Sequence, residues 1–423
     1  MPKLVQINVA SNYGSTGRIA ESVGLLAKAK GWDVWVVHGP RYANPSGLNT
    51  KCTQSALADK IHGVESWIFD RHGLGSRCAT AKLVKWLMEY KPDVVHLHNI
   101  HGYYINYPIL FDYLKESNVK VVWTLHDCWT FTGHCSHFDF IGCDKWKTGC
   151  FGCPQLHTYP KAWKIDNSKR NFELKGRYFT AIKDNLLLVP VSEWLNGLLK
   201  DSFLSDCKSR VIHNGIDTKT FDVVSSAEQY FDRFGLDASK KIILGVTNMW
   251  SDRKGLADFV KLNDIIDKTK YQILLVGLTK EQIAQLPAGI IGIERTDSVQ
   301  QLAGLYSLAS VFFNPTWEDN FPTTNLEAMA CGTPIITYRT GGSPEAVVEG
   351  VNGNVVPQGD LNAAYACIEK ICAEGKEKYQ DVCRKYAVDN FTREDRFMDY
   401  IELYEEILLP LGVSIVASRR SKV

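Results

Sequence analysis

Residues 314–350 read NPTWEDNFPTTNLEAMACGTPIITYRTGGSPEAVVEG, and this stretch decides the fold. The pattern predicts the end of a buried strand, an acidic loop, the start of a helix, a second strand at PIITYR and a Gly-Gly turn. Polar residues gather where the two strands end. Because ligands bind at the carboxyl ends of the strands in a parallel α/β sheet, the stretch predicts such a sheet and a binding site at its edge.

Two carboxylates enclose the expected helix start: Asp319 and Glu327 stand eight positions apart. The run between them includes Phe321, Pro322, Thr323 and Thr324. Carboxylates accept hydrogen bonds from sugar and ribose hydroxyls, and the amides at a helix N-terminus bind phosphate or hydroxyl oxygens. A sugar nucleotide fits this array. Thr324-x-x-Glu327 is equally a capping box, in which Glu327 would only close the helix N-terminus.

The chain resembles the retaining, nucleotide-sugar-dependent glycosyltransferases of family four, which have the GT-B fold. The resemblance rests on the Glu-x7-Glu signature of this loop and continues through LEAMACGTPIIT and GGSPEAVVEGVNGNVV. It covers nearly the whole chain and implies a nucleoside diphosphate sugar as donor. The acidic loop departs from the signature, since Asp319 stands eight positions before Glu327 and Glu318 nine. Either Glu318 or Asp319 therefore takes the sugar-binding role.

Apolar strand-like runs alternate with helix-like segments in two successive series. The first series is LVQINVA, DVWVVHG, DVVHLH, VKVVWTLH and LLLVPVS, and the second is KIILGV, YQILLVG, IIGIE, VFFNP and PIITYR. Such alternation is typical of parallel, doubly wound sheets. We therefore expect an α/β protein of two Rossmann-like domains that face one another across a cleft, as in GT-B.

The domain boundary is expected near RVIHNGIDTKTF, which should close the first half with a strand and an Asn-Gly turn. The resemblance makes this segment the interdomain linker. We expect an N-terminal acceptor domain at 1–208 and a C-terminal nucleotide-sugar domain at 209–395. The amphipathic segment within 396–423 should form a helix that crosses back to the first domain.

Composition restricts the class of protein further. A chain of 423 residues suits two domains, and a net charge of +1 gives no reason to expect a nucleic-acid partner. The N-terminal MPKLVQINVA predicts a first strand and no signal peptide, and no apolar run is long enough to span a membrane. We therefore expect a cytoplasmic enzyme. Arg419, Arg420 and Lys422 are too few to anchor it, which leaves at most a peripheral contact with the inner face of the membrane.

Two segments after predicted strands are candidates for binding the diphosphate. Gly14 and Gly17 follow the first strand and would let the backbone approach a pyrophosphate, although Gly-x-x-Gly also marks ordinary tight turns. Arg253 and Lys254 follow the first strand of the second half and would place positive charge beside the leaving group. In the resembled family Lys254 matches one diphosphate ligand. The usual arginine is missing at Thr247-Asn248, so Arg253 is expected to supply that charge.

Histidines cluster at the ends of two predicted strands. DVVHLHNIHGYY contains His96, His98 and His101, and TLHDCW contains His126 followed by Asp127. The resemblance assigns His126 to the transferred sugar and the acceptor side. Histidines at strand ends are often structural, yet we expect His96, His98, His101 and Asp127 to line the acceptor side as well.

Cysteines are concentrated in CWTFTGHCSHFDFIGCDKWKTGCFGCP. Cys150-x-x-Cys153 has chelating spacing, and Cys135 and Cys143 would complete four thiolates around a structural zinc ion. The alternative is a loop that only contains thiols. No cofactor is expected for catalysis itself.

These residues predict a retaining glycosyltransferase that moves a sugar from a nucleoside diphosphate to a hydroxyl of a glycan or lipid-linked glycan. By family analogy the acceptor belongs to a bacterial surface polysaccharide. His126, Lys254, Glu327 and Asp319 are the residues expected to carry the chemistry. Two alternatives stay open: a GT-B epimerase or hydrolase of nucleotide sugars, and a non-catalytic sugar-nucleotide-binding scaffold.

Overall fold

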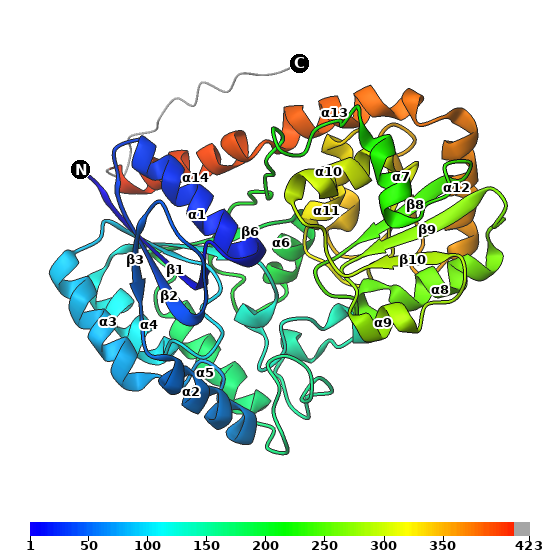
Figure 1. The fold of residues 1–423 in the computed structure, drawn as a ribbon. Helices are drawn as coiled ribbons and strands as arrows, with labels where there is room; N and C mark the ends of the chain where they lie inside the picture. The colour runs from blue at the N-terminus through cyan, green and yellow to red at the C-terminus, as the bar shows by residue number, and fades with distance from the viewer. Residues whose placement is uncertain (410–423) are drawn as a thin grey trace.

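The computed structural model describes residues 1–409, which form two α/β domains side by side (Figure 1). Each domain contains one sheet whose strands all pair in parallel, and helices cover both faces. Because both faces are covered, the central strands are continuous apolar runs, as in β4 (Val94–Leu97), in which every residue is buried. The expected α/β class with two Rossmann-like domains is confirmed.

The first sheet has the order β3-β2-β1-β4-β5-β6-β7. Its other strands are β1 (Lys3–Ser11), β2 (Asp33–Ala43), β3 (Asn49–Cys52), β5 (Lys120–Leu125), β6 (Leu186–Pro190) and β7 (Lys208–Ser209). Its helices are α1 (Gly14–Ala29), α2 (Ala56–Phe69), α3 (Arg77–Tyr90), α4 (Tyr107–Ser117), α5 (Ser168–Thr180) and α6 (Glu193–Lys200). A long insertion, residues 126–167, separates β5 from α5 and contains only short 3-10 turns.

The second sheet has the order β10-β9-β8-β11-β12-β13. Its strands are β8 (Lys241–Val246), β9 (Tyr271–Val276), β10 (Ile290–Ile293), β11 (Val311–Asn314), β12 (Ile335–Tyr338) and β13 (Gly353–Val356). Its helices are α7 (Tyr230–Phe234), α8 (Leu256–Ile265), α9 (Lys280–Ala284), α10 (Val299–Leu308), α11 (Thr323–Ala330), α12 (Leu361–Glu374) and α13 (Glu377–Phe391). The order reverses between β8 and β11, as it does between β1 and β4 in the first sheet. Such reversals are where open α/β sheets bind ligands.

The chain returns to the first domain through α14 (Arg393–Leu408). Thr392 caps this helix by accepting a hydrogen bond from the Asp395 amide, and the helix packs beside α1 (Figure 1). Tyr404 and Tyr400 are buried on the first sheet, where the Tyr404 hydroxyl lies 2.6 Å from His96 Nδ1. This packing ties the two ends of the described chain together. The basic residues Arg419, Arg420 and Lys422 lie outside the described part.

The strand expected at RVIH does not form. Pairing with β6 ends at Ser209, and the Arg210 and Ile212 amides then donate single hydrogen bonds to Leu188 and Pro190 as the chain leaves the sheet to become the linker. The short edge strands β3, β7 and β13 were not predicted. In the described residues, no helix is both long and apolar enough to cross a membrane.

Candidate functional site

A cavity of about 740 Å³ lies between the two domains, at the carboxyl ends of both sets of strands. Residues that follow β1, β4 and β5 line one side, and residues that follow β8 and β11 line the other. Both sheet reversals therefore open into the same cavity. Its volume is in the range of pockets that hold a whole small ligand.

Lys254 and Asp319 form an ion pair within this cavity. Lys254 ends a short 3-10 turn (Asp252–Lys254) after β8, and the acidic loop after β11 carries Asp319. Burial alone would raise the pKa of Asp319, but the Lys254 ammonium and its hydrogen bond lower the pKa below its ordinary value. Arg253 also lines the cavity and donates from Nη1 to the Glu318 carbonyl oxygen at 2.6 Å. The acidic loop is thus held by both cations.

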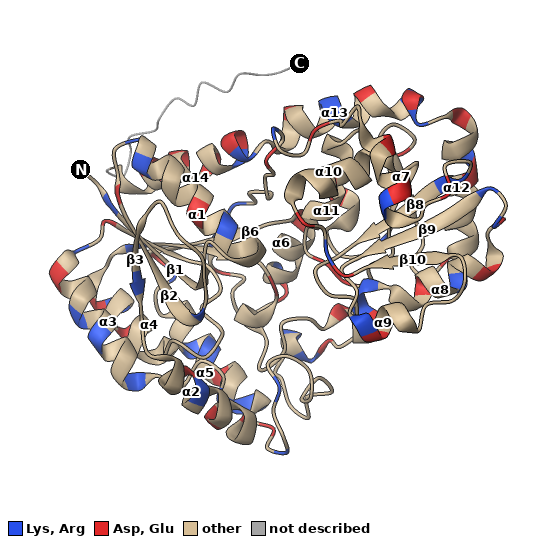
Figure 2. Ribbon diagram, in the orientation of Figure 1, with Lys and Arg blue, Asp and Glu red and all other residues tan. Residues whose placement is uncertain are grey.

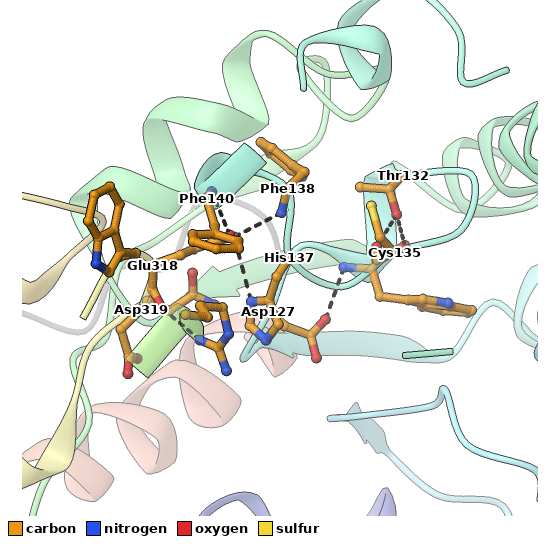
Figure 3. Close-up of polar contacts among 12 residues, drawn as sticks. Asp127, Thr132, Cys135, His137, Phe138, Phe140, Glu318 and Asp319 are labelled. Atoms are coloured by element: carbon orange, nitrogen blue, oxygen red, sulfur yellow. Dashed lines mark hydrogen bonds and ion pairs between the residues drawn. The ribbon is translucent and has the colours of Figure 1, made fainter. Parts of the chain in front are cut away.

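Glu318 is directed away from the cavity and into the insertion of the first domain (Figure 3). Its carboxylate is only 1% exposed, and it accepts hydrogen bonds from the amides of Phe138 at 3.1 Å and Phe140 at 3.0 Å. His137 Nδ1 lies 3.5 Å from the same carboxylate. Of the two adjacent acids, Asp319 alone lines the cavity, whereas Glu318 joins the domains.

Glu327 does not close a capping box. Helix α11 begins at Thr323 after Pro322, without a side-chain cap, so Glu327 stands inside the helix. Its Oε2 accepts a hydrogen bond from the Tyr306 hydroxyl at 3.1 Å, and the side chain lines the cavity. Burial raises the pKa of Glu327 to about 7. Phe321, Pro322 and Thr323 line the same wall, and Phe321 stacks on His213 of the linker.

The two glycines in the first turn of α1 have different roles. Gly14 has a φ of +64°, lines the cavity and has open space where a side chain would stand. Gly17 lies within α1, where a Cβ would approach the Ala10 side chain and the Asn12 amide nitrogen at 3.3 Å. Gly17 therefore permits close packing of α1 on β1, and its predicted place at the ligand is not observed.

The histidines form a buried chain beside the cavity. His126 and Asp127 line the cavity, whereas His96, His98 and His101 do not. His98 lies between two partners: its Nε2 is 3.0 Å from Gln6 Oε1, and its Nδ1 is 3.2 Å from His126 Nε2. Burial lowers the pKa of His126 to about 4, so the ring is neutral near pH 7.

His96 and His101 act as supports for other elements. His96 is fully buried against α14, so its predicted place on the acceptor side is wrong. His101 Nε2 lies 2.7 Å from Asp127 Oδ2, and its Nδ1 lies 3.1 Å from the Tyr159 hydroxyl. Although burial would raise the pKa of Asp127, His101 lowers it well below the ordinary range. His101 thereby keeps Asp127 ionised beside the cavity.

Four cysteines of the insertion line one small space of about 10 Å³, namely Cys135, Cys143, Cys150 and Cys153. A hydrogen bond from the Cys135 thiol lowers the pKa of Cys153 to about 7. Cys150 Sγ accepts a hydrogen bond from the Gly133 amide at 3.1 Å. Within residues 1–409, no three His, Cys, Asp or Glu side chains converge as metal ligands, so the zinc site stays a prediction.

Several cavity residues were not singled out from the sequence. Arg18 of α1 faces Glu327 and tends to lower its pKa, and it forms no ion pair with a described carboxylate. Asn320 donates from Nδ2 to the His126 carbonyl oxygen and so joins the acidic loop to β5. The position of Arg18, directly after Gly17 of the candidate phosphate loop, could have indicated its place at the cavity. No sequence signal pointed to Asn320, because its hydrogen-bond partner His126 belongs to the other domain.

Family models match both halves of the chain. The model described as Glycosyltransferase Family 4 matches residues 18–220, and that described as Glycosyl transferases group 1 matches residues 240–374. The chain belongs to the family 4 glycosyltransferases. The region matched by the first model contains His126, and the region matched by the second contains Lys254, Asp319 and Glu327.

A curated relative agrees with this assignment, and two solved structures have the same fold. The putative colanic acid biosynthesis glycosyl transferase WcaC of Escherichia coli is 27% identical over 283 residues, which are 64% of this chain and 65% of that protein. The sucrose-phosphate synthase of Thermosynechococcus elongatus superposes with a TM-score of 0.70 at 20% identity, over 96% of this chain and 99% of that one. Anabaena HepE, solved with UDP and glucose, gives a TM-score of 0.63 at 15% identity, over 96% and 100% of the two chains. These two structures share the GT-B fold.

Proposed function

We propose that this protein transfers a sugar from a nucleoside diphosphate sugar to a hydroxyl of a glycan acceptor, with retention of the anomeric configuration. The observation that carries the proposal is the single cavity into which both sheet reversals open. Cations, carboxylates and a helix N-terminus converge there. A nucleotide sugar needs all three kinds of group, for its phosphates, its hydroxyls and its leaving oxygen.

Each donor group has a matching residue. Lys254 and Arg253 would hold the diphosphate, with Arg18 approaching it from the first domain across the open backbone at Gly14. Glu327 would accept hydrogen bonds from the ribose hydroxyls. Asp319, beside the amides at the start of α11, would bind the transferred sugar. Glu318 is excluded from this role because both of its oxygens already accept backbone hydrogen bonds.

We infer a front-face substitution through an oxocarbenium-like state. The bond between the anomeric carbon and the diphosphate oxygen breaks as the acceptor oxygen approaches from the same face. The acceptor proton passes to the departing diphosphate oxygen, which Lys254 and Arg253 stabilise as its charge develops. No protein base is needed for this step. His126 is neutral near pH 7 and would act as a hydrogen-bonding partner of the sugar.

The comparisons support narrower choices. The complex of Anabaena HepE with UDP and glucose supports a uridine nucleotide as the first donor to test. The colanic acid relative supports a surface polysaccharide as the source of the acceptor. We take this acceptor to be lipid-linked and presented at the inner, cytoplasmic face of the membrane, as the resemblance to the family implies. This chain spans 65% of the length of that relative, so acceptor and linkage belong to the proposal.

The test is incubation of the full chain with a panel of UDP-, GDP- and dTDP-sugars. Nucleoside diphosphate release is followed with and without glycan acceptors, and the product anomer is read by NMR. Release that depends on acceptor, with a retained anomer, supports the proposal. Equal release without any acceptor indicates a hydrolase or epimerase, and binding without release indicates a scaffold. Either of the last two results overturns it.

A further inference from the structure

Helix α2 has its polar and apolar faces reversed. Leu57, Ile61 and Val64 stand at helical spacing on one side and are 68%, 61% and 54% exposed. A surface helix ordinarily turns such a stripe toward the core. Near the C-terminal end of the helix, Trp67 and Phe69 are also exposed, by 39% and 45%.

The opposite face of α2 is polar and buried. Asp59, His62 and Ser66 are each no more than 3% exposed. Asp59 pairs with Arg41, and His62 binds the Ser76 hydroxyl at 2.8 Å and the Gly75 amide at 3.1 Å. These contacts fix the rotation of the helix about its axis. The apolar stripe is therefore held outward by specific polar bonds.

The insertion adds aromatic surface beside this stripe. Trp163 is half exposed, its ring stacks on Trp67 with centroids 5.3 Å apart, and its amide donates to the Trp67 carbonyl at 2.7 Å. Ile165 follows and is 41% exposed. We call this surface the α2 face: Leu57, Ile61, Val64, Trp67, Phe69, Trp163 and Ile165. It is made by two segments, which meet where Trp163 stacks on Trp67.

Exposed cations stand on the two segments of the α2 face and on the first turn of α5. They are Lys60, Lys161, Lys164, Lys169 and Arg170, all exposed. None of them forms an ion pair with a carboxylate in the described chain, and Figure 2 shows the blue Lys and Arg segments on α2 and α5. The neighbouring acids are already engaged: Glu65 pairs with Arg71 at 3.2 Å, and Asp166 accepts from the Cys153 and Ser168 amides. The first turn of α5 is joined to α2 because Asn167 Nδ2 donates to the Phe69 carbonyl oxygen at 2.7 Å.

We propose that the α2 face docks on the surface of an anionic phospholipid membrane. Aliphatic side chains would enter the acyl boundary, the tryptophans would lie at the headgroup level, and the lysines would meet the phosphates. Charge favours this occupant over a second copy of the chain. A twofold contact through the α2 face would bring the same cations of both copies together, and they would repel.

The α2 face is connected to the acceptor side of the cavity. Tyr159 stands four positions before Trp163 in the insertion, and its hydroxyl lies 3.1 Å from His101, which holds Asp127 at the cavity. One segment thus contributes to both surfaces. Where the proposed glycosyl transfer holds, docking would bring a lipid-linked acceptor to the cavity without a membrane-spanning helix.

Vesicle co-sedimentation of the full chain tests the docking directly and needs no sugar substrate. We expect binding to vesicles of phosphatidylethanolamine with phosphatidylglycerol, and much weaker binding to phosphatidylcholine alone. Leu57→Glu/Ile61→Glu should lower the affinity by roughly tenfold or more, because two charges then stand where the chain enters the membrane. Lys161→Gln/Lys164→Gln should lower it several-fold on anionic vesicles only.

The matched control is Ile265→Glu/Val382→Glu, which makes the same change at residues that are 42% and 41% exposed on the second domain. It should bind within about twofold of wild type. Circular dichroism and the melting temperature confirm folding of each variant. The docking is overturned if wild type stays in the supernatant, or if the α2 variant binds equally well. The proposal is also overturned if size-exclusion chromatography shows that the wild type is a dimer and that Leu57→Glu/Ile61→Glu is a monomer. Lys254→Ala should keep full vesicle binding, so failure of docking and failure of sugar transfer are separable.

Discussion

Lys254 and Asp319 form an ion pair at the wall of the interdomain cavity, with their side chains 21% and 20% exposed. The pair brings together the turn after β8 and the loop after β11, two segments that flank the sheet reversal. In the proposed function, each partner is also a ligand of the donor. A bound donor would place its diphosphate on Lys254 and a sugar hydroxyl on Asp319, so the ion pair keeps Asp319 ionised and orients both side chains before the donor arrives.

Lys254→Ala should lower turnover by roughly 100-fold or more, because one electrostatic contact to the leaving group contributes about 3 kcal/mol at a transition state. The measurement is steady-state nucleoside diphosphate release with the best donor of the panel. Lys261→Ala, an exposed lysine on α8, is the matched control and should retain wild-type turnover. A Lys254→Ala turnover within about twofold of wild type would remove Lys254 from the diphosphate site.

Nucleotide binding should release protons near pH 7. In the free protein, burial raises the pKa of Glu327 to about 7, whereas ribose hydroxyls that donate to the carboxylate favour its ionised form. Binding therefore lowers the pKa, and affinity should rise between about pH 6 and pH 8. Calorimetry in buffers of different ionisation enthalpy measures the released protons.

Glu327→Gln separates this role from a purely structural one. Because the raised pKa makes the folded form bind more protons, the contribution of Glu327 to stability is full below its ordinary pKa of 4.5 and is lost as the pH rises through 7. Glutamine still accepts from Tyr306 and never ionises. The variant should be at least as stable as wild type at pH 8, bind nucleotide roughly tenfold more weakly, and show no proton release. Unchanged affinity and unchanged proton release would assign Glu327 to packing alone.

Glu318→Ala should loosen the insertion without removing a donor ligand. The change leaves the Phe138 and Phe140 amides without their acceptor, at a cost of about 1–3 kcal/mol for each buried group. Hydrogen exchange of these two amides should accelerate, and KM should rise more than kcat falls. Glu281→Ala, an exposed acid on α9, is the control and should change neither quantity. Unaltered exchange in Glu318→Ala would show that packing alone holds the insertion.

The fold could be predicted from sequence because its signal is local. Every apolar run of the two series forms a strand, and the doubly wound pattern follows from their alternation with helices. Only the separate strand expected at RVIH does not form. The short edge strands β3 and β7 were not predicted because NTKC and the two residues of β7 have almost no apolar side chains. Their pairing depends on the neighbouring strand.

Site residues next to strand ends could be predicted from the sequence, whereas contacts between the domains could not. Lys254, Asp319 and Glu327 lie on segments adjacent to strand ends, so their convergence follows from the sheet. The choice between Glu318 and Asp319 could not be made from spacing, since adjacent residues on a loop differ only in what the opposite domain offers them. The Phe138 and Phe140 amides, which donate hydrogen bonds to Glu318, are 180 and 178 positions away from it. His96 was misplaced for the same reason, because its partner Tyr404 stands 308 positions away.

The insertion that Glu318 holds also carries the four cysteines, and we predict that they bind one structural zinc ion. Cys135, Cys143, Cys150 and Cys153 line one space of about 10 Å³, and Cys153 already has a pKa of about 7. The four sulfurs would have to move closer together to hold zinc, and they would bind it as thiolates. Buried Lys175 donates to the Trp129 and Thr132 carbonyl oxygens next to this space. Burial lowers the pKa of Lys175 to about 7, and negative thiolates beside it would favour its charged form.

Elemental analysis of protein purified without chelator should give one zinc per chain. Cys153→Ser should lose it, whereas the matched control Cys78→Ser, an exposed cysteine on α3, should retain it. A chelator should lower the melting temperature of wild type and accelerate hydrogen exchange at Phe138 and Phe140, because the same insertion supplies these amides to Glu318. Well under one metal per chain, with all four thiols titrating freely in the folded protein, would contradict the prediction. The Glu318 hydrogen bonds and the apolar packing around Trp146 would then order the insertion without a metal.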